Sequence, residues 1–336
     1  MTTGGRRTVS WAALVIALLV YPFVDRAIGL QAVHAVSDGM IYVLLALGLN
    51  IVVGYAGLLD LGYAAFFAIG AYAMGLLNSP VLGSPLYGHA WSFWLCIWVA
   101  AAVSALLGLV IGAPTLRVRG DYLAIITLGF SEVVRITASN EIWLTNGTDG
   151  ISGIPGPWRG RVTPETFNLI FLALAAAVVA VVLVVLQRVR HSPYGRVLRA
   201  IRDDDQVASV AGKHVLRFKV EAFALSAGIL GVAGALWGHY TSFIAPDVFV
   251  PLITIYVVLA LTAGGTGNNW GAVLGAFLVV FFMEATRFAT GWLPSLKPVQ
   301  IAAVRELSIG ASLLVVLRFR PAGLLPERIP RMEVSR

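Results

Sequence analysis

Residues 39–59 read GMIYVLLALGLNIVVGYAGLL, a run without a single charged side chain. A helix needs about 20 predominantly apolar residues to cross the hydrocarbon core of a bilayer. Other uncharged runs reach that length, and they include residues 166–187, 222–246 and 248–283. The whole chain is 58% hydrophobic and 12% charged, whereas a soluble domain is about 25% charged. The sequence therefore predicts an all-α, polytopic membrane protein.

The apolar runs predict about ten membrane segments. They lie at residues 9–27, 35–54, 57–78, 90–112, 121–139, 166–187, 219–243, 249–263, 270–290 and 299–318. The second and third are separated only by the Gly54–Gly57 turn, which makes one of them a candidate for a broken or re-entrant segment. The first is expected to be an uncleaved helix, because Tyr21-Pro22-Phe23 is a poor signal-peptide cleavage site.

The Lys and Arg residues predict which side each loop faces. With the N-terminus inside, 17 of the 24 fall in cytoplasmic pieces and 4 in outer loops. Cytoplasmic loops carry such an excess, so both chain ends are expected in the cytoplasm, and the net charge of +7 needs no nucleic-acid partner. The predicted divisions are a cytoplasmic N-terminus (1–8), a transmembrane domain (9–318) with an extracytoplasmic loop (140–165) and a cytoplasmic loop (188–218), and a cytoplasmic tail (319–336).

A faint internal repeat suggests two related halves. AGLLDLGYAAF (56–66) and AGALWGHYTSF (233–243) agree at Ala, Gly, Leu, Tyr and Phe without gaps. The pair Glu132-x-x-Arg135 is similarly repeated as Glu284-x-x-Arg287. Gly and Ala inflate such matches, so chance is one explanation. The other is a pair of related halves, which is a common plan among transporters.

One compact charged segment interrupts the apolar chain: SPYGRVLRAIRDDDQVASVAGKHVLRFK at residues 192–219. Its first part places Arg196, Arg199 and Arg202 on one side and apolar residues on the other, which predicts a short amphipathic helix. Asp203 followed by Gln206 is a capping-box arrangement, and Gly212 can end a helix in a left-handed conformation. These signals predict a second helix at 204–211.

This second helix has small, neutral residues in its middle and is too short to be stable alone. It therefore needs a surface to pack against. The segment is either a loop whose charges mark the cytoplasmic side or a helix that docks into a groove of another protein. The arginines fit both interpretations, whereas the capped helix favours docking.

The segment resembles the cytoplasmic loop of ABC-importer permeases, whose pattern is Glu-Ala-Ala-x-x-x-Gly. Ala208 and Gly212 match this pattern, while Gln206 and Val207 depart from it. Other stretches resemble the LivM-type permeases of branched-chain amino-acid importers. They are LGLNIVVGYAGLLDLGYAAFFAIGAY (47–72), RGDYLAIITLGFSEVVRI (119–136), TNGTDGISGIP (145–155), FALSAGILGVAGALWGHYTSFIAPDVF (223–249) and RPAGLLPE (320–327). One departure is at Thr266 and Asn268, where the family more often has Leu and Ser.

This resemblance implies a multi-pass subunit of the bacterial cytoplasmic (inner) membrane, surrounded by lipid. Its partners would be a second homologous permease, two ATPase subunits and an extracytoplasmic binding protein. ATP and Mg would be bound by the ATPase subunits, and no cofactor is expected in this chain. The implied ATPase-coupling residues are Arg199, Arg202, Asp203, Asp205, Gln206, Val207, Ala208 and Gly212.

The sequence offers no catalytic or metal site. It lacks the GxxxxGK[ST] phosphate loop, so no ATP hydrolysis is expected in this chain. Its single cysteine, Cys96, lies in an apolar run and is expected to be a small buried side chain. No nucleophile and base, and no set of metal ligands, stand at a recognisable spacing, so the chain is not expected to be an enzyme.

Polar residues inside membrane segments are candidates for the substrate path, because they are costly there. These candidates are Asn50, Asp60, Glu132, Arg135 and His239. Each also has a structural alternative. The Glu132/Arg135 and Glu284/Arg287 pairs can form ion pairs within their helices, Asp60 can cap a helix, and Asn50 and His239 can bond to neighbouring helices.

The leading hypothesis is the permease subunit of an ATP-driven importer for branched-chain or hydrophobic amino acids. It would form half of the translocation path and couple to ATPases through residues 195–212. A related importer for urea or short amides is a close alternative. An ion-coupled secondary transporter acting alone would also suit the buried Glu and Arg residues, but it would leave the docking helix without a partner.

Overall fold

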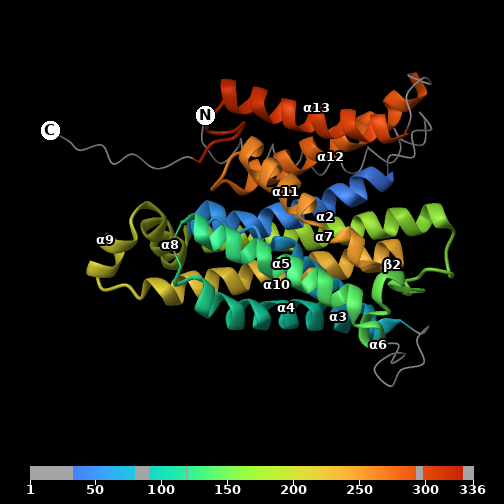
Figure 1. Cartoon of the computed structure of the whole chain (residues 1–336), viewed down its shortest axis with the longest axis horizontal. Coiled ribbons are helices and arrows are strands. Elements are labelled where there is room, and N and C mark those ends of the chain that lie inside the picture. Colours follow the sequence, from blue (N-terminus) through green and yellow to red (C-terminus); the bar gives the residue numbers. More distant parts are fainter. Residues whose placement is uncertain (1–32, 80–90, 119, 293–297, 328–336) are drawn as a thin grey trace.

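The computed structural model describes residues 33–79, 91–118, 120–292 and 298–327 (Figure 1). The first expected segment, residues 9–27, lies outside this range, together with residues 1–8 and the end of the tail at 328–336.

Within the described residues, the long apolar runs are helices, as the sequence predicts. The helices that correspond to the expected segments are α2 (Val33–Leu49) with its continuation η1 (Asn50–Tyr55), α3 (Tyr63–Asn78), α4 (Phe93–Thr115), α5 (Asp121–Asn140), α7 (Pro164–His191), α10 (Val215–Thr241), α11 (Pro251–Gly264), α12 (Asn269–Trp292) and α13 (Pro298–Phe319). Six apolar segments, α2 with η1, α4, α5, α7, α10 and residues 246–264, are long enough to cross a membrane. Helices α3, α12 and α13 contain shorter apolar stretches. The all-α membrane architecture is thereby confirmed.

Short elements lie at the two ends of this bundle. They are α6 (Ile142–Thr145), η2 (Gly147–Asp149), β1 (Ile151–Ser152), β2 (Phe243–Ile244) and η3 (Pro246–Val248) at one end, and α8 (Pro193–Asp203) and α9 (Asp205–Val210) at the other (Figure 1). Strands β1 and β2 pair antiparallel, with Ile151 opposite Ile244. This pairing connects the loop before α7 to the chain that follows α10. The two ends are called the strand end and the α9 end below.

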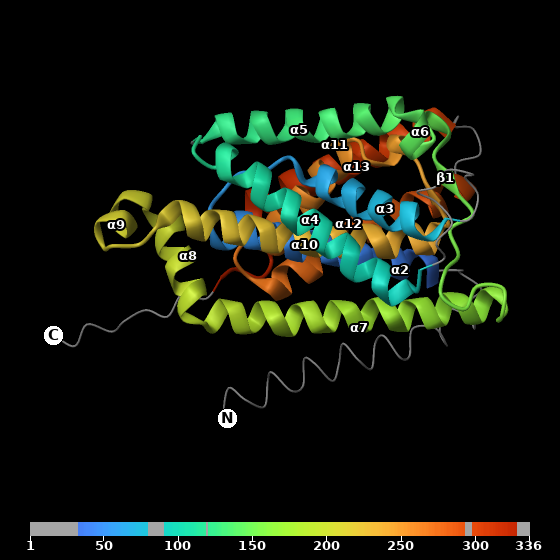
Figure 2. The same cartoon turned by 90° about the horizontal axis from the view of Figure 1, so that it is seen from below.

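Helix α10 lies at the centre of the packing, in contact with α4, α3 and α2 (Figure 2). Small residues allow its backbone to approach its neighbours, since a Cβ at Gly231 would collide with Ala100 and one at Gly234 would collide with Phe67. Such small-residue contacts are the usual way in which helices associate in membranes. Helix α7 packs on the other side of α2, and α5 covers α3.

Helices α11, α12 and α13 form a second group that joins the first mainly through contact between α12 and α2 (Figure 1). Helices α11 and α12 cross closely where Gly264 faces Gly271 and Gly275 faces Ala260. A tight turn at residues 265–268 connects them. This turn lies at the same end of the molecule as η1.

A non-helical connection, called the break below, separates the second and third segments near the predicted turn, and a re-entrant course of either segment stays a prediction. Helix α2 widens into the π-helical turn η1, and residues 57–62 are non-helical before α3 starts at Tyr63. The third segment therefore begins six residues later than the expected start at Gly57. Gly57 has a φ of +68°, and Gly62 packs so closely on the backbone of Thr127 in α5 that a larger residue would collide with it.

The two stretches of the internal repeat occupy different structures. Residues 56–66 form the break and the first turn of α3, whereas residues 233–243 form the last part of α10 and reach β2. The agreement of these eleven residues therefore does not mark equivalent elements. The second repeated pair cannot be compared, because the Arg287 side chain lies outside the described residues.

Candidate functional site

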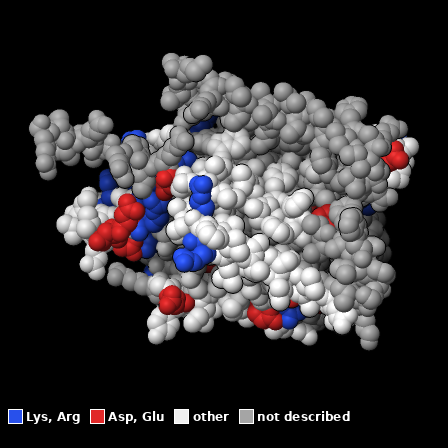
Figure 3. Space-filling view, turned by 90° about the horizontal axis from the view of Figure 1, so that it is seen from above, with Lys and Arg blue, Asp and Glu red and all other residues white. Residues whose placement is uncertain are grey.

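The α8–α9 segment, residues 192–212, projects from one end of the helix bundle (Figures 1 and 2). In the space-filling view of Figure 3, most of the visible Lys and Arg side chains lie at this end of the molecule. Ser192 is the N-cap of helix α8, because its Oγ accepts a hydrogen bond of 3.2 Å from the Gly195 amide, and Pro193 occupies the first helical position. Both are standard helix-start signals.

Helix α8 is amphipathic, as its sequence predicts. Leu198 and Ile201 are buried against the bundle. Tyr194 donates a hydrogen bond of 3.3 Å to the carbonyl of Phe218 at the start of α10, and burial raises the pKa of Tyr194. Helix α8 is thus packed on the bundle and is not a free loop.

The start of α9 differs from the prediction by one residue. Asp204, and not Asp203, is its N-cap, and its Oδ1 accepts from the amides of Gln206 (2.7 Å) and Val207 (3.1 Å). Helix α8 continues through Asp203, because the Asp204 amide still donates to the carbonyl of Ala200. The backbone of Asp204 is extended, which allows its side chain to reach the first amides of α9. The predicted end is confirmed, since Gly212 is left-handed with a φ of +76°.

One side of α9 faces the protein and the other faces solvent. Ala208 is only 4% exposed and faces the protein, whereas Val207 is 65% exposed and Val210 is 90% exposed. Asp205 is also turned inward, with its Oδ2 at 2.5 Å from Nζ of Lys219 in α10. Of the implied coupling residues, Gln206, Val207 and Gly212 therefore lie on the exposed surface, while Ala208 and Asp205 hold α9 to the bundle.

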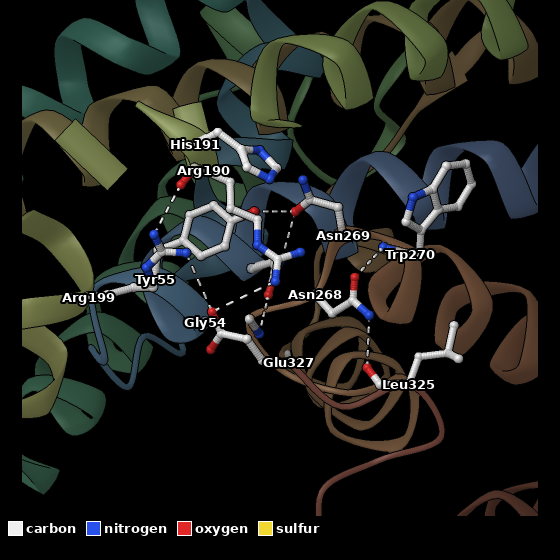
Figure 4. A network of polar contacts seen from close by, with 12 residues as sticks. Gly54, Tyr55, Arg190, His191, Arg199, Asn268, Asn269, Trp270, Leu325 and Glu327 are labelled. Carbon is white, nitrogen blue, oxygen red and sulfur yellow. Dashed lines mark hydrogen bonds and ion pairs between the residues drawn. The ribbon is translucent and has the colours of Figure 1, made fainter. Parts of the chain in front are cut away.

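Beneath the α8–α9 segment, one carboxylate meets three guanidinium groups (Figure 4). We call Arg190, Arg199, Arg202 and Glu327 the Glu327 cluster. The Arg202 Nη1 lies 2.8 Å from Glu327 Oε2, and Arg199 and Arg190 lie at 3.7 and 3.9 Å from Oε1. The Glu327 side chain is only 10% exposed, so its charge depends on these arginines for stabilisation.

Arg202 also contacts the break after α2. Its Nη1 donates a hydrogen bond of 2.5 Å to the carbonyl of Gly54. The stem of the same side chain covers Gly57, where an added Cβ would lie 2.6 Å from Arg202 Cγ. A predicted coupling residue thus joins α8 directly to the end of α2.

The chain that carries Glu327 lies against the turn between α11 and α12. The amides of Leu324 and Leu325 each donate a hydrogen bond of 2.9 Å, to the carbonyls of Ala263 and Gly264. Asn268 Nδ2 donates to the carbonyl of Leu325 at 3.0 Å (Figure 4). The backbone of residues 324–325 is therefore attached to the end of α11 and to the turn that precedes α12.

Asn50 joins α2 to the start of α12. Its Nδ2 donates to Oδ1 of Asn269 at 2.9 Å, and its Oδ1 accepts from the Gly267 amide at 2.8 Å. Tyr55 donates its hydroxyl to the same Asn269 oxygen (Figure 4). All three side chains are buried. The predicted interhelical hydrogen bonds of Asn50 are confirmed.

Asp60 and His239 also have structural partners. Asp60 is buried in the break, where its Oδ1 accepts from the Gly62 amide at 2.8 Å just before α3. His239 is fully buried in α10, with Nδ1 at 2.8 Å from the Ala235 carbonyl and Nε2 at 2.9 Å from Asn78 Nδ2. The contacts of His239 agree with the interhelical alternative, whereas Asp60 bonds within the turn before α3 and does not cap the helix, whose N-cap is Gly62. A role of either residue in the substrate path stays a prediction.

Glu132 and Arg135 form the predicted ion pair within α5. Their closest atoms, Glu132 Oε1 and Arg135 Nη2, are 2.5 Å apart, and both side chains are partly exposed. The described part of the chain also holds a cavity of about 200 Å³ between α2, α3, α10, α11 and α12. Asp38, Tyr42 and Glu284 line it among apolar residues, and the five predicted path residues are not among its lining.

Three residues of these contacts, Glu327, Arg190 and Asn269, are not predicted as site residues from the sequence. Glu327 ends the stretch RPAGLLPE, and its position as a lone acid after an apolar run was the available signal. Arg190 was counted only as a marker of the cytoplasmic side. Asn269 follows the glycine-rich turn, and nothing in its local pattern indicates that it meets Asn50, which is 219 residues away.

Comparison with known proteins places this arrangement in a family. The family described as "Branched-chain amino acid transport system / permease component" matches residues 31–317, nearly all of the helices above. The chain belongs to this family. It is 35% identical to the high-affinity branched-chain amino acid transport system permease protein LivM of Salmonella typhimurium, over 96% of this chain and 76% of the relative.

Two further relatives extend the comparison. The probable LivM permease of Methanocaldococcus jannaschii is 26% identical over 86% of this chain and 91% of the relative. The permease protein LivH of Salmonella typhimurium is 24% identical over 88% of this chain and 94% of the relative. No solved structure matches the chain. This branched-chain amino-acid permease is therefore a multi-pass membrane protein of a transport family.

Proposed function

We propose that this chain is the LivM-type subunit of an ATP-driven importer for branched-chain and other hydrophobic amino acids. It would form half of the translocation path and receive the movement of ATPase subunits through α8 and α9. The names of its relatives support the cargo. Salmonella typhimurium has two different permease proteins of this transport system, LivM and LivH, and both are similar to this chain. That supports pairing with a second permease.

The observation that carries the coupling role is the exposed apolar surface of α9. Val207 and Val210 project from the tip of the molecule, away from the membrane-length helices. An apolar patch on a charged, projecting helix is typical of a protein interface. In this proposal the α9 end faces the cytoplasm, the patch enters a groove of an ATPase subunit, and ATP and Mg are bound there. The strand end faces the extracytoplasmic side.

A substitution at Val210 tests this interface. In Val210→Asp, a carboxylate would have to be buried at the interface without a partner, which is costly. We expect copurification of the ATPase subunits and ATP-driven leucine uptake to fall by more than about tenfold, as for the central residues of other interfaces. Val210→Thr is the matched control, because it keeps the shape without adding charge. Equal copurification and uptake in wild type and Val210→Asp would contradict docking through α9.

The cargo is tested through the binding protein that works with this permease. Leucine, isoleucine and valine are expected to bind it, measured by titration calorimetry, and urea and short amides are expected not to bind. Binding of urea or amides alone would contradict the proposed cargo while leaving the coupling proposal intact.

A further inference from the structure

The Glu327 cluster connects parts of the chain that are far apart in sequence. Arg199 and Arg202 belong to α8, Arg190 to the last turn of α7, and Glu327 to the segment after α13. The three guanidinium groups share one acidic partner, Glu327, so their mutual repulsion is offset at this point. Their side chains are between 14% and 26% exposed, so solvent screens them only partly.

Each side of the cluster is attached to a different group of helices. On one side, α8 is packed on the bundle and Arg202 donates to Gly54 at the end of η1. On the other side, backbone hydrogen bonds from Leu324 and Leu325 attach the Glu327 segment to the end of α11. Two glycines allow the Glu327 segment to approach the turn after α11 closely. A Cβ at Gly265 would collide with Leu325, and one at Gly267 would lie 2.6 Å from Glu327 Oε2.

Removing Glu327 would break one of these two attachments and leave the other in place. Arg202 could still donate to Gly54, so α8 would remain in contact with α2. The ion pairs between α8 and the segment attached to α11 and the turn before α12 would be lost. The exposed face of α9, with Val207 and Val210, is not part of the cluster.

We propose that Glu327 is a positioning residue that ties α8, which Arg202 already joins to the end of η1, to the end of α11 and the turn before α12, so that displacement of the α8–α9 segment moves these parts together. This inference rests on the function proposed above. It adds that coupling requires a residue from the C-terminal segment, in addition to the loop that meets the ATPase.

Transport by the whole complex tests the proposal. The variants are Glu327→Gln, which removes the charge at constant size, Glu327→Asp, which keeps it, and Glu165→Gln as the control. Glu165 is an exposed carboxylate in the first turn of α7, near the strand end. Complexes carrying each variant are purified with their ATPase subunits, second permease and binding protein. ATP hydrolysis and leucine uptake are then measured in liposomes.

We expect Glu327→Gln to copurify normally and to lower the leucine taken up per ATP hydrolysed by about tenfold, within the usual range of coupling between sites. Glu327→Asp should recover part of this loss, and Glu165→Gln should match wild type. Unchanged uptake per ATP in Glu327→Gln would overturn the proposal. Loss of the ATPase subunits, or a proportional fall of uptake and hydrolysis, would also overturn it, because either would indicate a role in assembly alone.

A second measurement does not depend on transport. Hydrogen–deuterium exchange of the full chain in detergent should show faster exchange at residues 193–203 and 320–327 in Glu327→Gln, but not in Glu165→Gln. Unchanged exchange would overturn the proposal. A wild-type complex that shows no ATP-driven uptake would instead contradict the proposed function, and the exchange experiment would still decide whether Glu327 joins these segments.

Discussion

Gly57 and Gly212 share a left-handed backbone conformation in very different surroundings. Their φ values are +68° and +76°. An added Cβ at Gly57 would press on the stem of Arg202, whereas one at Gly212 would meet nothing within 4 Å. At Gly212 the backbone conformation alone favours glycine. At Gly57 the contact with α8 is a second requirement.

This difference predicts unequal effects of the same substitution. Gly212→Ala should destabilise the protein by about 1 kcal/mol, the cost of placing a side chain in the left-handed region. Gly57→Ala should cost clearly more, because Arg202 must also move away from Gly54. Thermal unfolding of the full chain in detergent measures both. Equal shifts of the unfolding midpoint would mean that Arg202 does not constrain Gly57.

At the scale of the element, α9 is held by its cap and by its inner side. A helix of this length is marginal in isolation. Asp204 satisfies two amides of its first turn, and Asp205 pairs with Lys219 of α10. These contacts allow a short helix to present Val207 and Val210 to solvent.

The position of the cap gives a prediction that separates two neighbouring aspartates. Asp204→Ala removes both cap hydrogen bonds, which should cost about 1 kcal/mol. Amide exchange at residues 206–208 should then accelerate by about fivefold. Asp203→Ala should change exchange little, because Asp203 is 72% exposed and its contact with Arg202 is 3.4 Å long. If hydrogen exchange accelerated more in Asp203→Ala than in Asp204→Ala, Asp203 would be the cap instead.

At the scale of the whole molecule, the distribution of charge distinguishes the two ends of the protein. The α9 end carries the Glu327 cluster and most of the Lys and Arg side chains visible in Figure 3. The strand end carries β1 and β2 (Figure 1). An excess of Lys and Arg marks the cytoplasmic side of membrane proteins, so the α9 end should be cytoplasmic.

Thiol labelling in cells checks this orientation. Cys96 is fully buried, so the background should be low. A cysteine introduced as Arg161→Cys, in the loop before α7, should react with a membrane-impermeant reagent added outside. A cysteine introduced as Ser209→Cys, on α9, should react only after the membrane is made permeable. The reverse pattern would place the α9 end outside and contradict coupling to cytoplasmic ATPases.

The sequence predicted the parts of this molecule that depend on local pattern. Uncharged runs located the helices, Gly54 and Gly57 located the break, and Gly212 located the end of α9. What could not be predicted depends on contacts between distant residues. The inward turn of Ala208 follows from how α9 packs on α10, and the partners of Glu327 and Asn269 appear only once the helices are assembled.

The separation between Arg202 and Glu327 has a consequence for the time course of synthesis. The two residues are 125 positions apart, and ribosomes add roughly 5–20 residues per second. The arginines of α8 are therefore made several seconds before their carboxylate exists. During that interval α11, α12 and α13 are synthesised while the arginines lack this partner. Closure of the cluster therefore has to wait for the synthesis of Glu327, and a chain that stops before Glu327 cannot reach it.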